Sequence, residues 1–465
     1  MKNYFLILFP LLLLAGQTHG SWFTGSTLRI NLYHTGTADT SFMTLGSLSM
    51  EGAWYGPRKN LVDPFENGKY RLIVRDKQTD KVLLKYYYNS LFGEWQTTAE
   101  AKKSWGTMEE SLYIPFPAKK IVFRIEERTG NNSWRKIIRR EINPEALEIK
   151  RENARTAANA DTLLFSGKLN RKVDIAVIAE GYTESEKAKF SGDAKRLFNK
   201  LFSTAPYVKF KDRFNIWLVF VPSADSGPDN PARGKYSRTA VDASFYTFGS
   251  QRYLMTTDNR AIHDAVINVP HDQIYILVNE KEYGGGGIFN FYNVTSVDNP
   301  SSDFVFVHEF GHGFAGLADE YYSSETGYDE FYARGVEPSE PNITAVTEKE
   351  KLKWKDLVKP ETPVPTPWNK EEFDKREADH RRKLGELKDR EAIREERESF
   401  AKWKKNFYHS LPYGFTVGAY EGAGYLSRGL YRPYPDCIMR SRDFGYFCPV
   451  CERAITERIR WVCDE

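Results

Sequence analysis

The stretch from residue 304 to residue 322 reads Phe304-Val-Phe-Val-His308-Glu309-Phe-Gly-His312-Gly-Phe-Ala-Gly316-Leu-Ala-Asp319-Glu320-Tyr-Tyr322. On a helix, residues four apart share one face, so the imidazoles of His308 and His312 can bind one metal ion. Glu309 lies beside the first histidine and can take a proton from a water on that ion. The apolar residues that lead into the motif place the helix inside its domain. The stretch therefore predicts a buried helix that carries a zinc site and a general base.

Gly316 is the predicted end of this helix, because glycine tolerates the left-handed backbone of a helix exit. Asp319 follows three residues later and offers an anionic oxygen ligand. In the metzincin pattern His-Glu-x-x-His-x-x-Gly-x-x-His, the third ligand also lies three residues after the glycine. This chain has one extra residue before the glycine and aspartate in place of the third histidine. The interval favours Asp319 as the third ligand, and Glu320 is the competing candidate.

A methionine turn beneath the metal is the second mark of metzincins, and Met439 in Asp436-Cys437-Ile-Met439-Arg is its candidate. The alternative interpretation is an ordinary core methionine. Ser441 stands where some metzincins carry a tyrosine, and Tyr446 is a candidate for an equivalent role. Both residues lie far along the chain from the histidines, so their part in the site is a hypothesis.

A run of glycines, Gly284 to Gly287, precedes the apolar segment 288–291. Metalloproteases bind substrate as an added strand along a sheet edge, where glycines let one backbone approach another. Gly285, Gly286 and Gly287 are therefore candidates for the substrate rim. A flexible loop without a binding role is an equally open interpretation.

The N-terminal part of the chain has the pattern of an antiparallel β-sandwich. Segments 70–75, 81–88 and 121–125 are rich in β-branched and aromatic residues. Turn residues at 76–80 and 129–133 predict two hairpins. We expect an all-β sandwich over residues 21–145, followed by a polar linker over 146–164.

From residue 165 the pattern changes to alternating strands and helices. Segments 173–178, 214–220 and 273–278 are apolar runs typical of buried strands. Thr183 and Glu186 form a predicted capping box that opens a helix. The apolar face of that helix consists of Phe190, Ala194, Leu197, Phe198 and Leu201. We expect an α+β or α/β, metzincin-like zinc protease domain with a mixed sheet over residues 165–465.

Residues 369–405 interrupt this domain with a stretch dominated by Glu, Lys, Arg and Asp, after Pro363, Pro365 and Pro367. Its few apolar residues keep no steady heptad, which argues against a coiled-coil partner site. A solvated helix or helical hairpin inserted into the catalytic domain is the favoured interpretation.

Residues 1–20 have the pattern of a secretory signal peptide, with Lys2 before a short apolar run and small residues before Ser21. The sequence contains no other apolar run long enough to span a membrane. We therefore expect export to the periplasm, the cell surface or the medium, without membrane insertion.

Among 465 residues, 66 Lys and Arg balance 63 Asp and Glu, which argues against nucleic acid as a partner. An aromatic content of 14% excludes a disordered chain.

The four cysteines, Cys437, Cys448, Cys451 and Cys463, lie close together in the sequence. In an exported protein disulfides are favoured. The alternative is a second zinc site, because Cys448-Pro-Val-Cys451 is one half of a zinc-ribbon spacing and Cys437 and Cys463 could complete four thiolate ligands. The polar segment 223–230 offers oxygen ligands but lacks the spacing of a calcium loop, so a turn is favoured over a calcium site.

The motif 308–322 resembles the core motif of the family M64 metallopeptidases, the IgA-peptidase-type relatives of metzincins. Segments 178–183 and 283–293, together with Cys437-Ile-Met439 and Cys448-Pro-Val-Cys451, are also similar to that family. The resemblance spans about residues 165–465, and the preceding β domain resembles one that often accompanies it. It implies Glu309 as general base, His308, His312 and Asp319 as zinc ligands, and Met439 as the turn beneath them.

The expected function is that of an exported zinc endopeptidase whose substrates are extracellular proteins, such as immunoglobulin or other host glycoproteins. One alternative is a binding or adhesion module with a vestigial zinc site. An intact Glu309 argues against it, because a structural zinc needs no base. The other is an amidase that acts on peptidoglycan peptides with the same zinc chemistry. The cleft that would separate these functions is not readable from the sequence.

Overall fold

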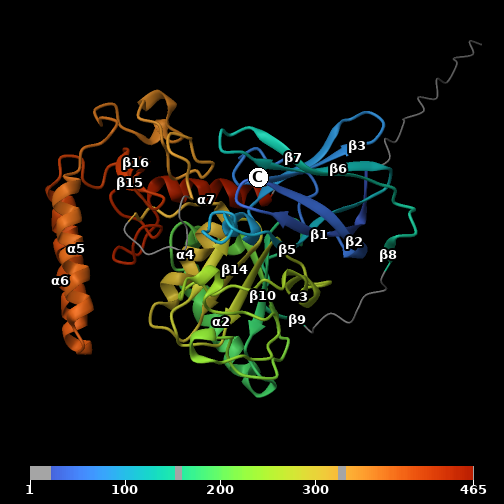
Figure 1. Cartoon of the computed structure of the whole chain (residues 1–465), viewed down its shortest axis with the longest axis horizontal. Coiled ribbons are helices and arrows are strands. Elements are labelled where there is room, and N and C mark those ends of the chain that lie inside the picture. The colour runs from blue at the N-terminus through green and yellow to red at the C-terminus, as the bar shows by residue number, and fades with distance from the viewer. Residues whose placement is uncertain (1–21, 152–159, 323–330, 464–465) are drawn as a thin grey trace, which may run out of the picture.

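The computed structural model of the chain describes residues 22–151, 160–322 and 331–463. The predicted signal peptide, residues 1–20, lies outside the described residues. Three parts are visible in Figure 1: an N-terminal region of strands, a mixed region of strands and helices, and a helical hairpin that stands at one end of the molecule.

The N-terminal region is all-β apart from the short helix α1 (Leu91–Trp95) and contains two four-stranded sheets. One sheet has the order β5-β1-β2-β8 and the other β4-β3-β6-β7. The strands are β1 (Phe23–Gly36), β2 (Ser41–Ala53), β3 (Tyr70–Asp76), β4 (Val82–Tyr88), β5 (Gly106–Pro117), β6 (Ile121–Arg128), β7 (Trp134–Ile142) and β8 (Ile149–Arg151). Leu28 and Ile30 of β1 meet Leu72 and Ile125 of the other sheet in one buried core. Both predicted hairpins are confirmed, since β3 pairs with β4 and β6 with β7.

Two short strands lie within the predicted linker 146–164. β8 pairs in parallel with β2, and β9 (Ala160–Leu164) pairs antiparallel with β11 (Phe214–Val219). The N-terminal sheet thus reaches Arg151 and the second sheet begins at Ala160. Backbone pairing at a sheet edge stabilises such strands without an apolar pattern, so the polar sequence gave no sign of them.

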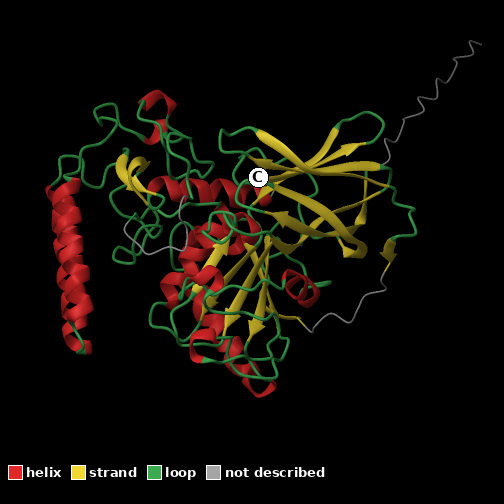
Figure 2. Cartoon of the chain, viewed as in Figure 1, coloured by secondary structure: helices red, strands yellow, loops and turns green. Residues whose placement is uncertain are grey.

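The second region contains a mixed six-stranded sheet of order β13-β14-β12-β10-β11-β9 (Figure 2). Its remaining strands are β10 (Val173–Glu180), β12 (Gln273–Val278), β13 (Gly285–Ile288) and β14 (Tyr292–Ser296). The inner strands run parallel, and the edge strands β9 and β13 run antiparallel to their neighbours. The strands predicted at 173–178, 214–220 and 273–278 are confirmed, as is the mixed α/β class.

Both faces of this sheet are covered, which explains the continuous apolar runs of its strands. Val173, Ile175 and Val177 of β10 face a core shared with α2 (Lys187–Leu201) and α4 (Ser302–Ala315). The alternate residues of β10 face a second core that includes α3 (Asn259–Ala265). The predicted capping box of Thr183 and Glu186 is present, and the predicted apolar face of α2 is buried.

The charged insertion forms a hairpin of α5 (Lys370–Glu386) and α6 (Arg390–Ser410), which confirms the predicted helical hairpin. Its base is not solvated, however, because Phe373 and Tyr408 are buried in a cluster with Trp368. The buried ammonium of Lys404 lies 3.0 Å from a carboxylate oxygen of Asp436, in the segment that precedes Met439. The hairpin is therefore anchored beside the predicted methionine turn.

The last helix is α7 (Pro449–Val462), which Cys448 caps and in which Pro449 occupies the first position. It contacts the N-terminal region: Arg458 lies 2.7 Å from Asp63, and Asn60 donates to the carbonyl of Trp461. Both members of the ion pair are buried. The helix thus links the two sheet regions (Figure 1).

The remaining elements are short. They are the strands β15 (Tyr420–Ala423) and β16 (Leu426–Arg432), and the 3-10 turns Glu184–Glu186, Tyr207–Lys209, Lys211–Arg213, Pro231–Arg233, Thr247–Gly249, Lys349–Lys351 and Lys355–Leu357.

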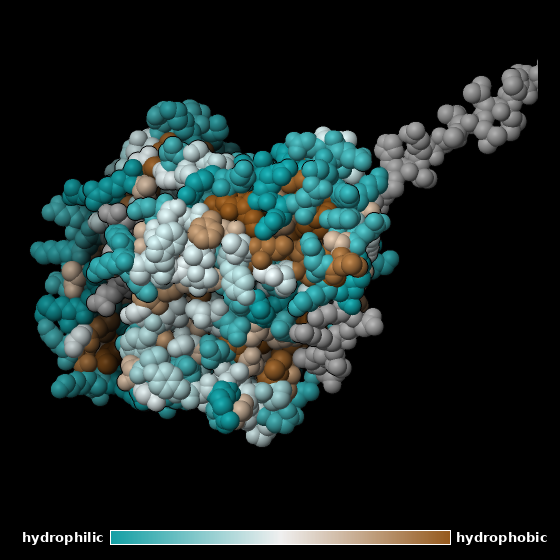
Figure 3. Space-filling view, turned by 45° about the vertical axis from the view of Figure 1, so that its right-hand side comes forward, coloured by the Kyte–Doolittle hydropathy of each residue, from teal (hydrophilic) through white to brown (hydrophobic). Residues whose placement is uncertain are grey.

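The face seen in Figure 3 is largely hydrophilic, with hydrophobic side chains in several separate patches. Among the described residues, no helix combines the length and apolar character needed to cross a membrane.

Candidate metal centre and active site

Helix α4 carries the predicted zinc motif and is held by aromatic packing. Phe306 stacks on Tyr275 of β12 with ring centroids 4.3 Å apart, and it meets Phe198 of α2 edge to face. The helix ends at Gly316, whose φ of 63° is the predicted left-handed exit. This exit turns the chain so that residues 317–320 come back along the face that carries the histidines.

His308, His312 and Asp319 converge on one point. The two Nε2 atoms are 3.1 Å apart. The Oδ1 atom of Asp319 lies 3.1 Å from Nε2 of His308 and 3.3 Å from Nε2 of His312. All three residues come from α4 or the turn after it, so they lie close together in the sequence.

Backbone carbonyls orient both imidazoles. Nδ1 of His308 lies 3.0 Å from the carbonyl of Ile438, and Nδ1 of His312 lies 2.6 Å from the carbonyl of Leu317. A carbonyl only accepts, so each Nδ1 carries the hydrogen and each Nε2 presents a lone pair. Two lone pairs and a carboxylate oxygen then face one another without a donor, which is the donor set that suits Zn²⁺.

The electrostatics of this cluster agree with a bound cation. Burial lowers the pKa of His312, but the carboxylate of Asp319 outweighs that effect and raises the pKa to about 9. The imidazoles in turn hold the pKa of Asp319 well below its usual range, against the effect of burial. In the metal-free protein a proton therefore takes the place between these side chains that a metal cation would take.

Glu309 is half-buried and lines the same cleft as the histidines. Burial raises the pKa of Glu309, and the neighbouring His308 and His312 oppose this shift. A carboxylate with a raised pKa, next to a group that could hold a metal ion and in a cleft lining, is suited to exchange protons with water.

Glu320, the competing third ligand, faces a different cluster. Its Oε1 atom lies 3.2 Å from Sγ of Cys451, and its backbone N–H donates to the carbonyl of Met439. The chain after Gly316 is not helical, so the side chains of Asp319 and Glu320 point in different directions. The histidines are faced by Asp319.

The expectation of disulfides is wrong, because all four cysteines are free and buried. Sγ of Cys437 and Sγ of Cys451 lie 3.8 Å apart, well beyond a disulfide bond of about 2.05 Å. Cys463 lies at the other end of α7, with its sulfur 3.8 Å from the carbonyl of Arg213. The cysteines that are close in sequence thus divide into a group of three and a separate one.

Met439 is fully buried beneath α4. A Cβ atom placed on Gly311, between the two histidines, would lie 2.8 Å from the sulfur of Met439. The preceding residue, Ile438, supplies the carbonyl that orients His308. Tyr446 is not among the residues that line the cleft. Its backbone carbonyl accepts a hydrogen bond from the N–H of Ile438.

A cleft of about 420 Å³ surrounds the cluster. Sequence reasoning missed several of its residues, because they lie in turns or in another domain and carry no motif. Tyr425 donates to Oδ2 of Asp319, and Arg252 also lines the cleft. Asn89 and Glu94 reach it from the N-terminal region, and Glu377 and His380 reach it from α5.

The comparisons with known proteins cover both parts of the chain. Residues 161–459 match the family model described as IgA peptidase M64, and residues 19–139 match the model of the peptidase M64 N-terminus. The chain belongs to peptidase family M64. A search of the curated proteins returned no match. Family membership makes the chain a peptidase that acts on proteins or peptides, and such peptidases are typically metal-dependent.

In this M64 peptidase the glycines of β13 line the cleft, and β13 is an edge strand of the sheet. They also allow α4 to pack closely. A Cβ atom on Gly287 would overlap the backbone carbonyl oxygen of Glu309, and one on Gly285 would lie 2.8 Å from Val305. Gly285 forms a bridge with Tyr253, which covers one end of the strand.

Replacement of Gly287 by alanine is expected to lower the free energy of unfolding by about 1–3 kcal/mol, because the added methyl forces β13 and α4 apart. Gly130→Ala is the matched control, since no heavy atom lies within 4 Å of its Cβ position. Its effect should stay within about 0.5 kcal/mol. Urea denaturation of both variants measures the difference, and equal midpoints would contradict this role of Gly287.

The carboxylates of the segment 223–230, considered above for calcium, accept hydrogen bonds from residues that follow the segment. Asp225 accepts from the backbone and side chain of Arg238, and Asp229 accepts from the N–H of Ser237. These bonds stabilise a turn. Within the described part of the chain, two groups could hold a metal ion: His308, Glu309 and His312, and the cluster of Glu320 with three cysteines.

Proposed function

We propose that the chain is an exported zinc endopeptidase with a metzincin-like catalytic domain and an N-terminal β-sandwich. His308, His312 and Asp319 would hold the zinc ion above the turn at Met439, and Glu309 would be the general base. The observation that carries the proposal is the convergence of three metal-binding side chains, with no donor among them, beside a half-buried glutamate in one cleft. The predicted signal peptide supports export.

Zinc bound to these three side chains would polarise the scissile carbonyl and lower the pKa of a water molecule. Glu309 would accept a proton from the attacking water and would donate it to the leaving nitrogen. The hydroxyl of Tyr425 donates to Oδ2 of Asp319 and so fixes the orientation of that carboxylate. The carbonyls of Ile438 and Leu317 keep both imidazoles in the tautomer that presents Nε2.

The substrate would lie along β13 as an added strand, with its backbone against Gly286 and Gly287. This is supported by the position of β13 at the sheet edge and by its place in the cleft lining. An extended peptide fits such an edge better than a compact ligand does, which favours endopeptidase activity on exposed loops of extracellular proteins. Immunoglobulin is a candidate substrate because the matching family model is described as an IgA peptidase.

Metal removal tests this function. The purified protein is incubated with reduced casein, immunoglobulin A or peptidoglycan, with and without 1,10-phenanthroline, and the products are identified by mass spectrometry. We expect protein fragments that disappear with the chelator and return when zinc is added. The isomer 1,7-phenanthroline, which does not chelate, should leave cleavage unchanged. Cleavage that persists without metal would contradict the proposal, and release of peptidoglycan peptides alone would favour an amidase.

A further inference from the structure

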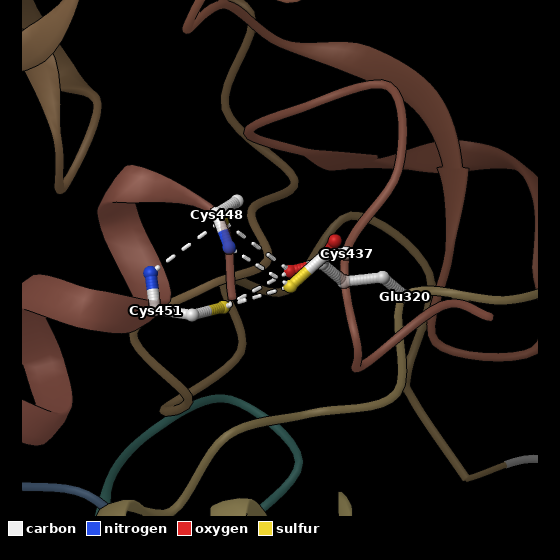
Figure 4. A group of neighbouring side chains, drawn as sticks. All are labelled: Glu320, Cys437, Cys448 and Cys451. Atoms are coloured by element: carbon white, nitrogen blue, oxygen red, sulfur yellow. Dashed lines mark hydrogen bonds between the residues drawn. The ribbon is translucent and has the colours of Figure 1, made fainter. Parts of the chain in front are cut away.

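A second group of metal-binding side chains lies inside the protein, apart from the histidine cluster. Cys437, Cys448, Cys451 and Glu320 point toward one another (Figure 4), and all four are fully buried. Their ligand atoms lie within 4.8 Å of one another. The first three residues come from the C-terminal segment, and Glu320 comes from the turn after α4.

The distances match those around one shared ion. In a tetrahedral site with Zn–S bonds of about 2.3 Å, the sulfur atoms are about 3.8 Å apart. The sulfur atoms of Cys437 and Cys451 are 3.8 Å apart. Oε1 of Glu320 lies 3.2 Å from Sγ of Cys451 and 4.0 Å from Sγ of Cys448, on either side of the roughly 3.5 Å expected between oxygen and sulfur ligands.

Backbone N–H groups donate to two of the three sulfur atoms. The N–H of Cys448 lies 3.2 Å from Sγ of Cys437, and the N–H of Cys451 lies 3.5 Å from Sγ of Cys448. Cys448 is also the N-cap of α7, where the helix dipole favours an anion. Hydrogen bonds of this kind commonly support the ligands of a bound metal.

One carboxylate oxygen of Glu320 is hydrogen-bonded, and the other has no hydrogen-bond partner among the described residues. Asn342 donates to Oε1 of Glu320 at 3.0 Å, and Asn342 is itself fixed by the backbone N–H and carbonyl of Ala318. Oε2 of Glu320 is buried without a hydrogen-bond partner among the described residues. A buried carboxylate beside three thiols is costly without a cation, and a polar group of this kind points to a ligand that satisfies it.

We propose that Cys437, Cys448, Cys451 and Glu320 hold a second, structural zinc ion. Three soft thiolates select zinc over magnesium or calcium, and four protein ligands leave no open position for catalysis. Binding releases the thiol protons to solvent, so no oxidant or reductant is needed. The ion also shields three thiols from oxidation.

The location gives this ion a specific role. Glu320 directly follows Asp319, and Cys437 lies two residues before Met439. The second ion therefore ties the turn that carries the third catalytic ligand to the predicted methionine turn and to the start of α7. The second ion would therefore stabilise the backbone next to the histidine cluster. Its binding does not depend on whether the protein cleaves peptides.

Metal analysis of the full-length purified protein tests the proposal. We expect about two zinc ions per chain in the wild type and about one in the double variant His308→Ala/His312→Ala. X-ray absorption at the zinc edge of this double variant should show zinc–sulfur distances of about 2.3 Å. Cys448→Ser should lose one zinc ion, and Cys463→Ser, which changes the cysteine outside the cluster, should keep both.

Several outcomes would overturn the proposal of a second zinc site. A double variant without zinc, a remaining ion with only nitrogen and oxygen ligands, or iron in place of zinc would each do so. A disulfide among Cys437, Cys448 and Cys451 in non-reduced peptides would also refute the site. The double variant keeps the test independent of whether Cys448→Ser folds. Loss of peptidase activity with both zinc ions present would instead count against the proposed function alone.

Discussion

Replacement of Glu309 by glutamine is expected to lower kcat/KM for protein cleavage by about 10²–10⁴-fold, the range for loss of a general base. The amide keeps the size of the carboxylate but cannot accept the proton of the attacking water. The carboxylate of Glu309 lies near both histidines. Because Asp319 already supplies the carboxylate oxygen that faces both Nε2 atoms, we expect zinc content to stay at the wild-type level. Initial rates on casein, measured beside metal content, check both statements.

Glu377→Gln is the matched control for this experiment. It removes a carboxylate that lines the same cleft from α5. We expect its kcat to stay within a few-fold of wild type, because Glu377 is not one of the proposed zinc ligands or the proposed base. Equal activity of the Glu309→Gln variant and the wild type would exclude Glu309 as the base.

Replacement of Asp319 by alanine is expected to remove the catalytic zinc and, with it, cleavage. Oδ1 of Asp319 lies within 3.3 Å of both histidine Nε2 atoms, so its loss deletes one of three ligands. The fall in zinc affinity should exceed the roughly 10–100-fold that loss of an outer partner of a ligand costs. Competition with a chromophoric chelator measures this affinity.

The variant Glu320→Gln distinguishes the role of the Glu320 carboxylate from that of the neighbouring Asp319 carboxylate. This variant should keep the catalytic zinc and weaken the sulfur-ligated zinc, whereas Asp319→Ala should do the reverse. X-ray absorption distinguishes the two ions by their sulfur content. If Glu320→Gln lost the nitrogen-ligated zinc and Asp319→Ala kept it, the third ligand would be Glu320.

Much of the site was predictable because its elements are local. The interval of four residues between His308 and His312 determines a shared helix face, and Gly316 determines where that helix ends. Apolar runs likewise predicted the inner strands, since strands buried on both faces need apolar residues at every position. The helical hairpin followed from its charged composition, but its buried base did not, because contacts of Phe373 and Lys404 are made with distant segments.

The helix, the histidine pair, the adjacent glutamate and the family resemblance were predictable from the amino-acid sequence, because these depend on short intervals along the chain. That Asp319 faces the histidines while Glu320 faces the cysteines followed from tertiary packing. Tertiary packing also separated Cys463 from the other cysteines and brought Asn89 and Glu94 to the cleft. These outcomes depend on how segments more than a hundred residues apart pack together, and burial selects that packing from the whole chain at once.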